Sequence, residues 1–205
     1  MDSINVTNLH KFFELQSNNN LEEITRYLDS KYNEMKEKNW EDKTRFYDPG
    51  NRHYSYNIFH FYNKGIYNLQ NDIKNLVIEA CDYYNIDFDS QNYYIHGWFN
   101  YWPEQYNLKM NPDELHYHDH GDTSPNLFHG YYCVNAEPSI THYKIDGTRF
   151  DNINKNNKVI VSKNGYPHSA GEWIENSPRI TIAYNISPLE FLHRDVEKGG
   201  QFVKL

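Results

Sequence analysis

The second half of this 205-residue chain contains seven short runs rich in β-branched and aromatic residues, separated by Asn, Pro, Gly and Asp. Runs of this kind at close spacing are typical of strands in an antiparallel sandwich or barrel. No glycine-rich phosphate-binding loop follows any of them, which argues against a nucleotide-binding α/β fold. The runs are 92–102, 114–120, 127–134, 139–145, 157–163, 179–187 and, more weakly, 201–205.

The first half of the chain predicts two helices. Apolar residues recur at helical spacing in 20–38, where Asn20 is a suitable N-cap and acidic residues follow in the first turn. A second helix fits 65–84, whose apolar stripe is expected to pack in the core. We expect both helices to cover one face of the predicted sheet. The chain is then a single domain, 1–205, with mainly helical residues 1–88 supporting a β core in residues 89–205.

The overall composition excludes several functional classes. The net charge is −8, which argues against a broad footprint on duplex nucleic acid or on an anionic membrane. No stretch approaches the ~20 apolar residues that a bilayer-spanning helix needs, and the N-terminus lacks the apolar core of a signal peptide. Cys81 and Cys133 lie in apolar surroundings and are expected to be buried, reduced thiols. We therefore expect a cytoplasmic protein without a membrane segment.

Histidine is concentrated in one of the predicted strands, within the sequence ELHYHDHGD at 114–122. Alternate residues of a strand share a face, so His116, His118, His120 and Asp122 would point the same way. The two-residue spacing of His120 and Asp122 lets an imidazole and a carboxylate reach one ion. The pairs 116/118 and 118/120 are alternatives, and 120/122 is preferred because it supplies a carboxylate.

Two later residues complete a candidate site. His168 follows the apolar run 157–163 and a turn, and it is the best candidate for a distant third ligand. Two histidines and one carboxylate on one face leave up to three coordination positions open, as in non-haem Fe(II) oxygenases. Arg179 opens the next run, where it would share a face with Thr181 and Ala183. A buried arginine is costly unless it meets an anion, and its planar fork suits a carboxylate.

These motifs, in this order, resemble those of the Fe(II)- and 2-oxoglutarate-dependent oxygenases. The resemblance covers roughly residues 91–190, through the segments WFNYW, HGDTSPNLFHGYYCV, YPHSAGEW and RITIAYNIS. It points to the branch related to prolyl hydroxylases and their small microbial and viral relatives. It implies an α+β fold with a double-stranded β-helix core, also called a jelly-roll or cupin-like core, and with N-terminal helices packed on one sheet.

The resemblance also implies roles for individual residues. His120, Asp122 and His168 would be the catalytic ligands of Fe(II), and O2 would be the oxidant. His116 and His118 would line the mouth of the cavity or lie behind the ligands. The residues that would bind the cosubstrate 2-oxoglutarate are Arg179, Tyr132, Thr181 and Asn100.

The function that the resemblance implies is that of a dioxygenase. It would hydroxylate a C–H bond of a peptidyl or small-molecule substrate while 2-oxoglutarate is converted to succinate and CO2. Two other interpretations stay open. One is a cupin-like metalloenzyme that uses the same histidines without 2-oxoglutarate, and the other is a non-catalytic jelly-roll binding or structural protein. The sequence sets neither the substrate nor the oligomeric state.

Overall fold

The computed structural model describes residues 5–7, 10–37, 51–52, 57–89, 92–102, 117–120, 127–189 and 202–205. Its largest element is a sheet of eight strands in the order β1-β2-β8-β5-β10-β4-β11, with β3 paired to β4. Every described pairing is antiparallel. The strands of this sheet are β1 (Asn5–Thr7), β2 (His10–Gln16), β3 (Asn51–Arg52), β4 (Tyr93–Trp102), β5 (Phe128–Asn135), β8 (Lys158–Lys163), β10 (Arg179–Pro188) and β11 (Val203–Lys204).

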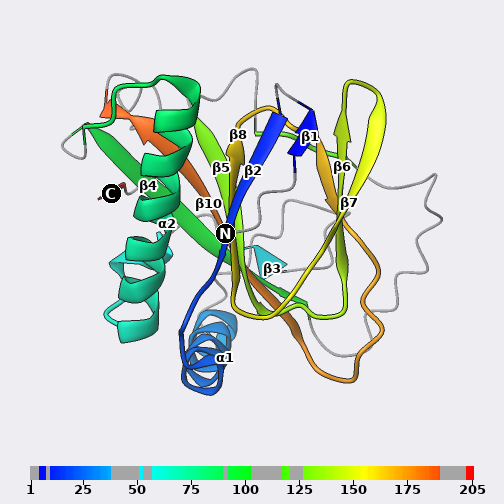
Figure 1. Cartoon of the computed structure of the whole chain (residues 1–205). Helices are drawn as coiled ribbons and strands as arrows, with labels where there is room; N and C mark the ends of the chain where they lie inside the picture. Colours follow the sequence, from blue (N-terminus) through cyan, green and yellow to red (C-terminus); the bar gives the residue numbers. More distant parts are fainter. Residues whose placement is uncertain are drawn as a thin grey trace.

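A second, smaller sheet has the order β7-β6-β9. Its strands are β6 (Ile140–Ile145), β7 (Thr148–Ile153) and β9 (His168–Ala170). An isolated antiparallel bridge between His118 and His168 places the segment 117–120 beside β9. Figure 1 shows the β6–β7 hairpin on one side of the large sheet and helix α2 (Lys64–Tyr84) on the other. Two facing antiparallel sheets supported by helices confirm the expected α+β, jelly-roll-like class.

The helices form where the sequence predicts them, because their ends are capped. Helix α1 (Leu21–Glu37) begins after Asn20, whose side chain accepts a hydrogen bond from the backbone N–H of Glu23. Helix α2 begins after Asn63, which accepts from two backbone N–H groups, and it ends at Asn85 in the left-handed conformation. No helix in the described ranges is both long and apolar enough to cross a membrane.

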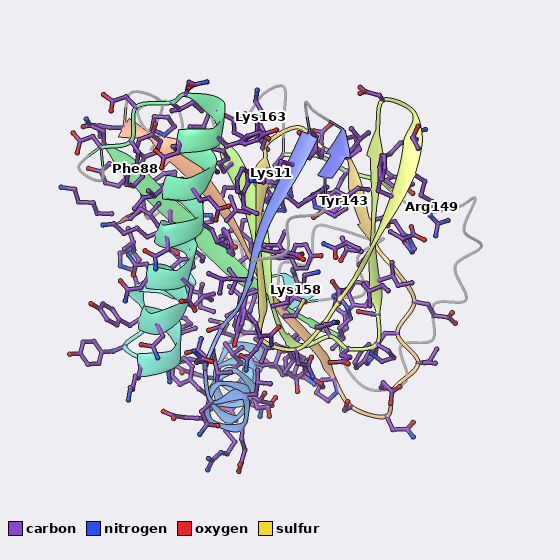
Figure 2. The ribbon with its side chains drawn as sticks, viewed as in Figure 1. Lys11, Phe88, Tyr143, Arg149, Lys158 and Lys163 are labelled. Carbon is purple, nitrogen blue, oxygen red and sulfur yellow. The ribbon has the colours of Figure 1, made fainter. Side chains whose placement is uncertain are left out.

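Strand alternation divides the buried side chains into two cores. The stripe of α2 and the buried residues of α1 pack on one face of the large sheet, which confirms that the helices cover one face. The other face meets the small sheet in an inter-sheet core that includes Phe12, Trp98 and Tyr143. Tyr143, on β6, lies on the side of the large sheet away from α2 (Figure 2), with its ring centroid 4.6 Å from that of Phe12. The α2 stripe comprises Ile66, Leu69, Ile73, Leu76, Val77 and Ala80, all buried.

Five of the described strands lie where the sequence predicted none, namely β1, β2, β3, β7 and β9, and β2 and β7 are the longest of them. Strand β2, in the half expected to be mainly helical, pairs with β8 along its length from Phe12 to Gln16. Phe13 faces the helices and Phe12 faces the small sheet, so both faces of β2 are buried and the polar–apolar alternation that would reveal a strand is missing. Strand β7 is mostly exposed and polar, so it too lacks an apolar signal.

Candidate active site

A cavity lies between the two sheets, and its lining comes from both. The large sheet contributes side chains from β4, β5 and β10, and the small sheet contributes side chains from β6 and β9 together with the segment beside it. On β10 the lining residues alternate, as predicted: Arg179, Thr181 and Ala183 face the cavity. The other lining residues are Trp98, Asn100, Trp102, His118, His120, His129, Tyr131, Thr141, His168 and Ala170.

Three histidines gather at one end of this cavity. One ring nitrogen each of His118, His120 and His168 lies within 4.8 Å of the corresponding nitrogen of the other two. The backbones of His118 and His168 exchange hydrogen bonds of 3.0 and 2.8 Å, which fix the two strand segments side by side. Nδ1 of His168 lies 3.0 Å from the carbonyl oxygen of Tyr166, and a donor bond there leaves Nε2 for a metal. Asn164 donates to the carbonyl oxygen of His120 and anchors that residue in turn.

The structure brings together only part of the predicted metal triad. His120 and His168 lie in the cluster as the sequence indicated, but Asp122 and His116 lie outside the described residues. His118 contributes the third described nitrogen, so the alternative pair 118/120 is also present at the cavity. Asp119, between these two histidines, is exposed, which is the alternation expected of an extended segment.

A fourth histidine, His129 on β5, was missed by the sequence reasoning. Its ring stacks on that of His120 with a centroid separation of 3.9 Å and on that of His168 at 4.8 Å. Its Nδ1 lies 2.9 Å from Oδ1 of Asn185. Burial, together with the neighbouring imidazole of His168, holds the pKa of His129 well below its usual value, so this ring is neutral. The sequence shows only that His129 lies two residues before Tyr131 on a predicted strand and so shares its face; its position beside His120 depends on how the strands pair.

Arg179 lies elsewhere in the cavity wall and is only 3% exposed. Its Nε donates to Oγ of Ser139 at 3.1 Å, and its guanidinium carbon lies 5.2 Å from the centroid of the Trp102 ring. Burial lowers the pKa of Arg179, but a guanidinium remains charged in proteins. Within the described part of the chain no acidic side chain forms an ion pair with it. A buried cation without a carboxylate partner is a site for an anionic ligand.

The neighbouring strand supplies a second group with unused hydrogen-bonding capacity. Asn100 of β4 lies opposite Thr181 of β10, and its Nδ2 donates to Oγ1 of Thr181 at 3.3 Å. Oδ1 of Asn100 is buried and has no hydrogen-bond partner among the described residues. Since a buried carbonyl oxygen without a partner costs free energy, this atom is positioned for a ligand donor.

The structure does not place Tyr132 beside Arg179, which corrects the tyrosine chosen from the sequence. Tyr132 lies opposite Ile182 on β10, in the core under the helices, and its hydroxyl donates to Oδ1 of Asn157. Tyr131 lies opposite Ala183 and lines the cavity. A strand alternates faces at every residue, so an error of one position moves a side chain to the other side of the sheet.

Comparison with known proteins establishes the fold. No protein-family model matches this sequence, and no curated protein matches it significantly. The structure is similar to the prolyl-4-hydroxylase of Pseudomonas putida, with a TM-score of 0.57 over 87% of this chain and 92% of that one, at 9% identity. It is also similar to a candidate oxygenase from Shewanella oneidensis, with a TM-score of 0.54 over 92% and 91% of the two chains, at 13% identity. The chain therefore has the double-stranded β-helix fold of these proteins, while its activity has to be argued from the site.

The described side chains fit a divalent transition metal and a dicarboxylate. Neutral imidazoles are suitable ligands for iron, and the four rings at this end of the cavity contact one another, with centroid separations of 3.9 Å between His120 and His129, 4.5 Å between His118 and His168 and 5.2 Å between His120 and His168. The buried guanidinium of Arg179 and the unpartnered oxygen of Asn100 line the same cavity. One cavity therefore offers both a metal-binding end and an anion-binding wall.

Proposed function

We propose that this protein is an Fe(II)- and 2-oxoglutarate-dependent dioxygenase that hydroxylates a C–H bond. The observation that carries the proposal is the buried cation of Arg179, which has no acidic partner within the described ranges and lines the same cavity as a histidine cluster. A structural arginine would be paired or solvated, and a structural histidine cluster would need no anion site beside it.

The residues would divide the work as follows. His120 and His168, with Asp122, would hold the metal. Arg179 would bind the distal carboxylate of 2-oxoglutarate, and Thr181 would contribute its hydroxyl. When bound, Fe(II) would supply the redox chemistry that couples O2 to the conversion of 2-oxoglutarate into succinate and CO2. The walls that would exclude water and orient the cosubstrate are Trp98, Trp102, Tyr131 and Asn100.

His118 leaves a second ligand set to be tested. Its nitrogen lies in the described cluster, and three imidazoles alone would suit a cupin-like metalloenzyme that does not use 2-oxoglutarate. Anaerobic measurement of bound iron in Asp122→Ala and His118→Ala separates the two sets. We expect Asp122→Ala to lose iron and His118→Ala to keep most of it; the reverse result would assign the three-histidine site.

The use of 2-oxoglutarate is tested at Arg179. Titration calorimetry should detect 2-oxoglutarate binding to the Mn(II)-loaded protein, and Arg179→Ala should weaken it by at least tenfold, because a charge-assisted bidentate contact is lost. Metal affinity should stay unchanged in this variant. Equal binding of 2-oxoglutarate by the variant and the native protein would contradict the role of Arg179, and no binding by the native protein would favour the cupin-like alternative.

The proposed substrate is a peptide or a small molecule. The rings of Trp98 and Trp102 line the cavity and would pack on an apolar or cyclic group presented to the metal. The proposal is tested by a screen of peptides, amino acids and nucleosides for stimulated succinate release. Stimulation by nucleosides alone would exclude a peptidyl substrate.

A further inference from the structure

We propose that Asn154 is a positioning residue that sets the orientation of Arg179 and Tyr131, and so determines the affinity of the site for a dicarboxylate. The inference rests on the proposed function. Asn154 does not line the cavity. It lies directly after β7, and its side chain is fully buried behind the cavity wall.

The side chain of Asn154 is the centre of a buried hydrogen-bond network. Its Oδ1 accepts from the hydroxyl of Tyr131 at 3.0 Å and from Oγ1 of Thr141 at 3.2 Å. The thiol of Cys133 is a weaker donor to the same oxygen at 3.7 Å. Its Nδ2 donates to Oγ of Ser139 at 3.0 Å. One amide therefore contacts both a side chain of the cavity wall and the residue that receives the bond from Arg179.

Ser139 connects Asn154 to Arg179 through hydrogen bonds to its hydroxyl oxygen. A hydroxyl has one hydrogen and two lone pairs, and Ser139 donates its hydrogen to the carbonyl oxygen of Ala136. Both lone pairs then accept, one from Nδ2 of Asn154 and the other from Nε of Arg179 at 3.1 Å. The bond through Nε fixes the plane of the guanidinium and leaves its terminal nitrogens as donors toward the cavity. The network is fully satisfied only with this arrangement.

The network requires an amide at position 154 rather than a carboxylate. An aspartate would still accept from Tyr131, but it could not donate to Ser139. It would also place a negative charge close to Arg179, because only the hydroxyl of Ser139 separates the two side chains. That hydroxyl lies 3.0 Å from Nδ2 of Asn154 and 3.1 Å from Nε of Arg179. In a buried setting that charge would pair with the guanidinium and compete with the carboxylate of the ligand. The uncharged amide keeps Arg179 available.

The test is Asn154→Asp, a nearly isosteric change, with Asn152→Asp as the matched control. Asn152 is also buried and lies two residues earlier, on β7. Its Oδ1 accepts from Nζ of Lys158, which is labelled in Figure 2, and it does not line the cavity. Calorimetric titration of 2-oxoglutarate into each Mn(II)-loaded protein gives its dissociation constant. We expect Asn154→Asp to raise this constant at least tenfold with unchanged Mn(II) affinity, and Asn152→Asp to change it less than twofold.

A second variant covers the case in which Asn154→Asp does not fold. Ser139→Ala removes the bridge without adding charge and should raise the dissociation constant about three- to tenfold. If the native protein binds 2-oxoglutarate and these variants, folded, bind it as tightly, Asn154 is only structural and the inference is overturned. If the native protein itself does not bind 2-oxoglutarate, the proposed function fails, and the inference fails with it.

Discussion

At the scale of single residues, the unusual feature of this protein is the stack of imidazoles around His129. This ring cannot be a charged group, because burial and its neighbours hold its pKa low. Its Nδ1 is engaged with Asn185, and its face covers His120. We interpret His129 as packing that holds the ligand rings in place, rather than as a ligand.

Substitution of His129 distinguishes packing from ligation. His129→Phe keeps a flat ring against His120 and should bind Mn(II) within about threefold of the native protein, whereas His129→Ala removes the support and should bind it about tenfold more weakly. The measurement is calorimetric titration with Mn(II). Equal losses in the two variants would identify a nitrogen of His129 as a metal ligand.

Loss of the hydroxyl group should affect ligand binding at Tyr131 and stability at Tyr132. Tyr131 lines the cavity and its hydroxyl donates to Asn154 behind the wall. Tyr131→Phe removes this hydrogen bond and should weaken 2-oxoglutarate binding by about three- to tenfold. Tyr132→Phe leaves Oδ1 of Asn157 without its donor and should lower the free energy of unfolding by about 1–2 kcal/mol with no change in ligand binding. Binding and urea unfolding should be measured for both variants. A binding defect confined to Tyr132→Phe would reverse the assignment.

A comparison of β10 with β5 shows which parts of the site could be predicted from the sequence. Arg179 and Thr181 were placed correctly because alternation within a single strand is a local property. The choice between Tyr131 and Tyr132 depends on how β5 pairs with β10, and a single sequence gives no information about that register. His129 was missed for the same reason, since its relation to His120 exists only across strands.

At the scale of elements, β5 lies close to the backbone of its antiparallel neighbour β8 at Gly130. A Cβ atom at Gly130 would lie 2.0 Å from the carbonyl oxygen of Ile160 and 2.6 Å from the ring of Tyr184. Tyr184 itself donates its hydroxyl to that carbonyl at 2.7 Å, so neither neighbour can move freely. Glycine at this position therefore allows the central strands to approach one another.

Gly130→Ala should reduce the free energy of unfolding by about 3 kcal/mol or prevent folding, because backbone atoms would have to shift. Gly65→Ala is the matched control. Its new Cβ would meet only side-chain atoms of Asn63 and Ile24, at 3.1 Å or more, and should cost less than about 1 kcal/mol. Urea unfolding of both variants gives the comparison, and similar costs would show that the β5–β8 contact can relax.

At the scale of the whole molecule, the two faces of the large sheet have different roles. Its helix-side face is apolar and closes a core with α1 and α2, while its other face carries the cavity residues. The sequence predicted that the helices cover one face of the sheet, since long apolar stripes in helices are strong signals. It did not predict β2, which is buried on both faces, and the third metal ligand stays a prediction because Asp122 lies outside the described residues.

The free energy of unfolding should be lower at alkaline pH than at neutral pH, because the core under the helices contains a buried thiol. Burial raises the pKa of Cys81, on α2, from 9.0 to about 11. Below pH 9 the thiol is protonated in both states; between pH 9 and about 11 only the unfolded state ionises, so stability falls as the pH rises. Urea unfolding at pH 8 and 10.5 should show that the native protein loses up to about 2 kcal/mol more than Cys81→Ala. Equal losses would show that the buried thiol does not contribute.

The cavity face has one further property that matters for evolution. Ala183 on the large sheet and Ala170 on the small sheet line the cavity from opposite walls, and neither belongs to the core under the helices. Larger side chains at either position would narrow the space offered to a substrate and leave the core under the helices unchanged, but at Ala183 they would also press on the inter-sheet core, to which this residue belongs. Ala170 is not part of that core, so a library randomised at Ala170 would vary the space offered to a substrate with less effect on folding than one randomised at Ala183.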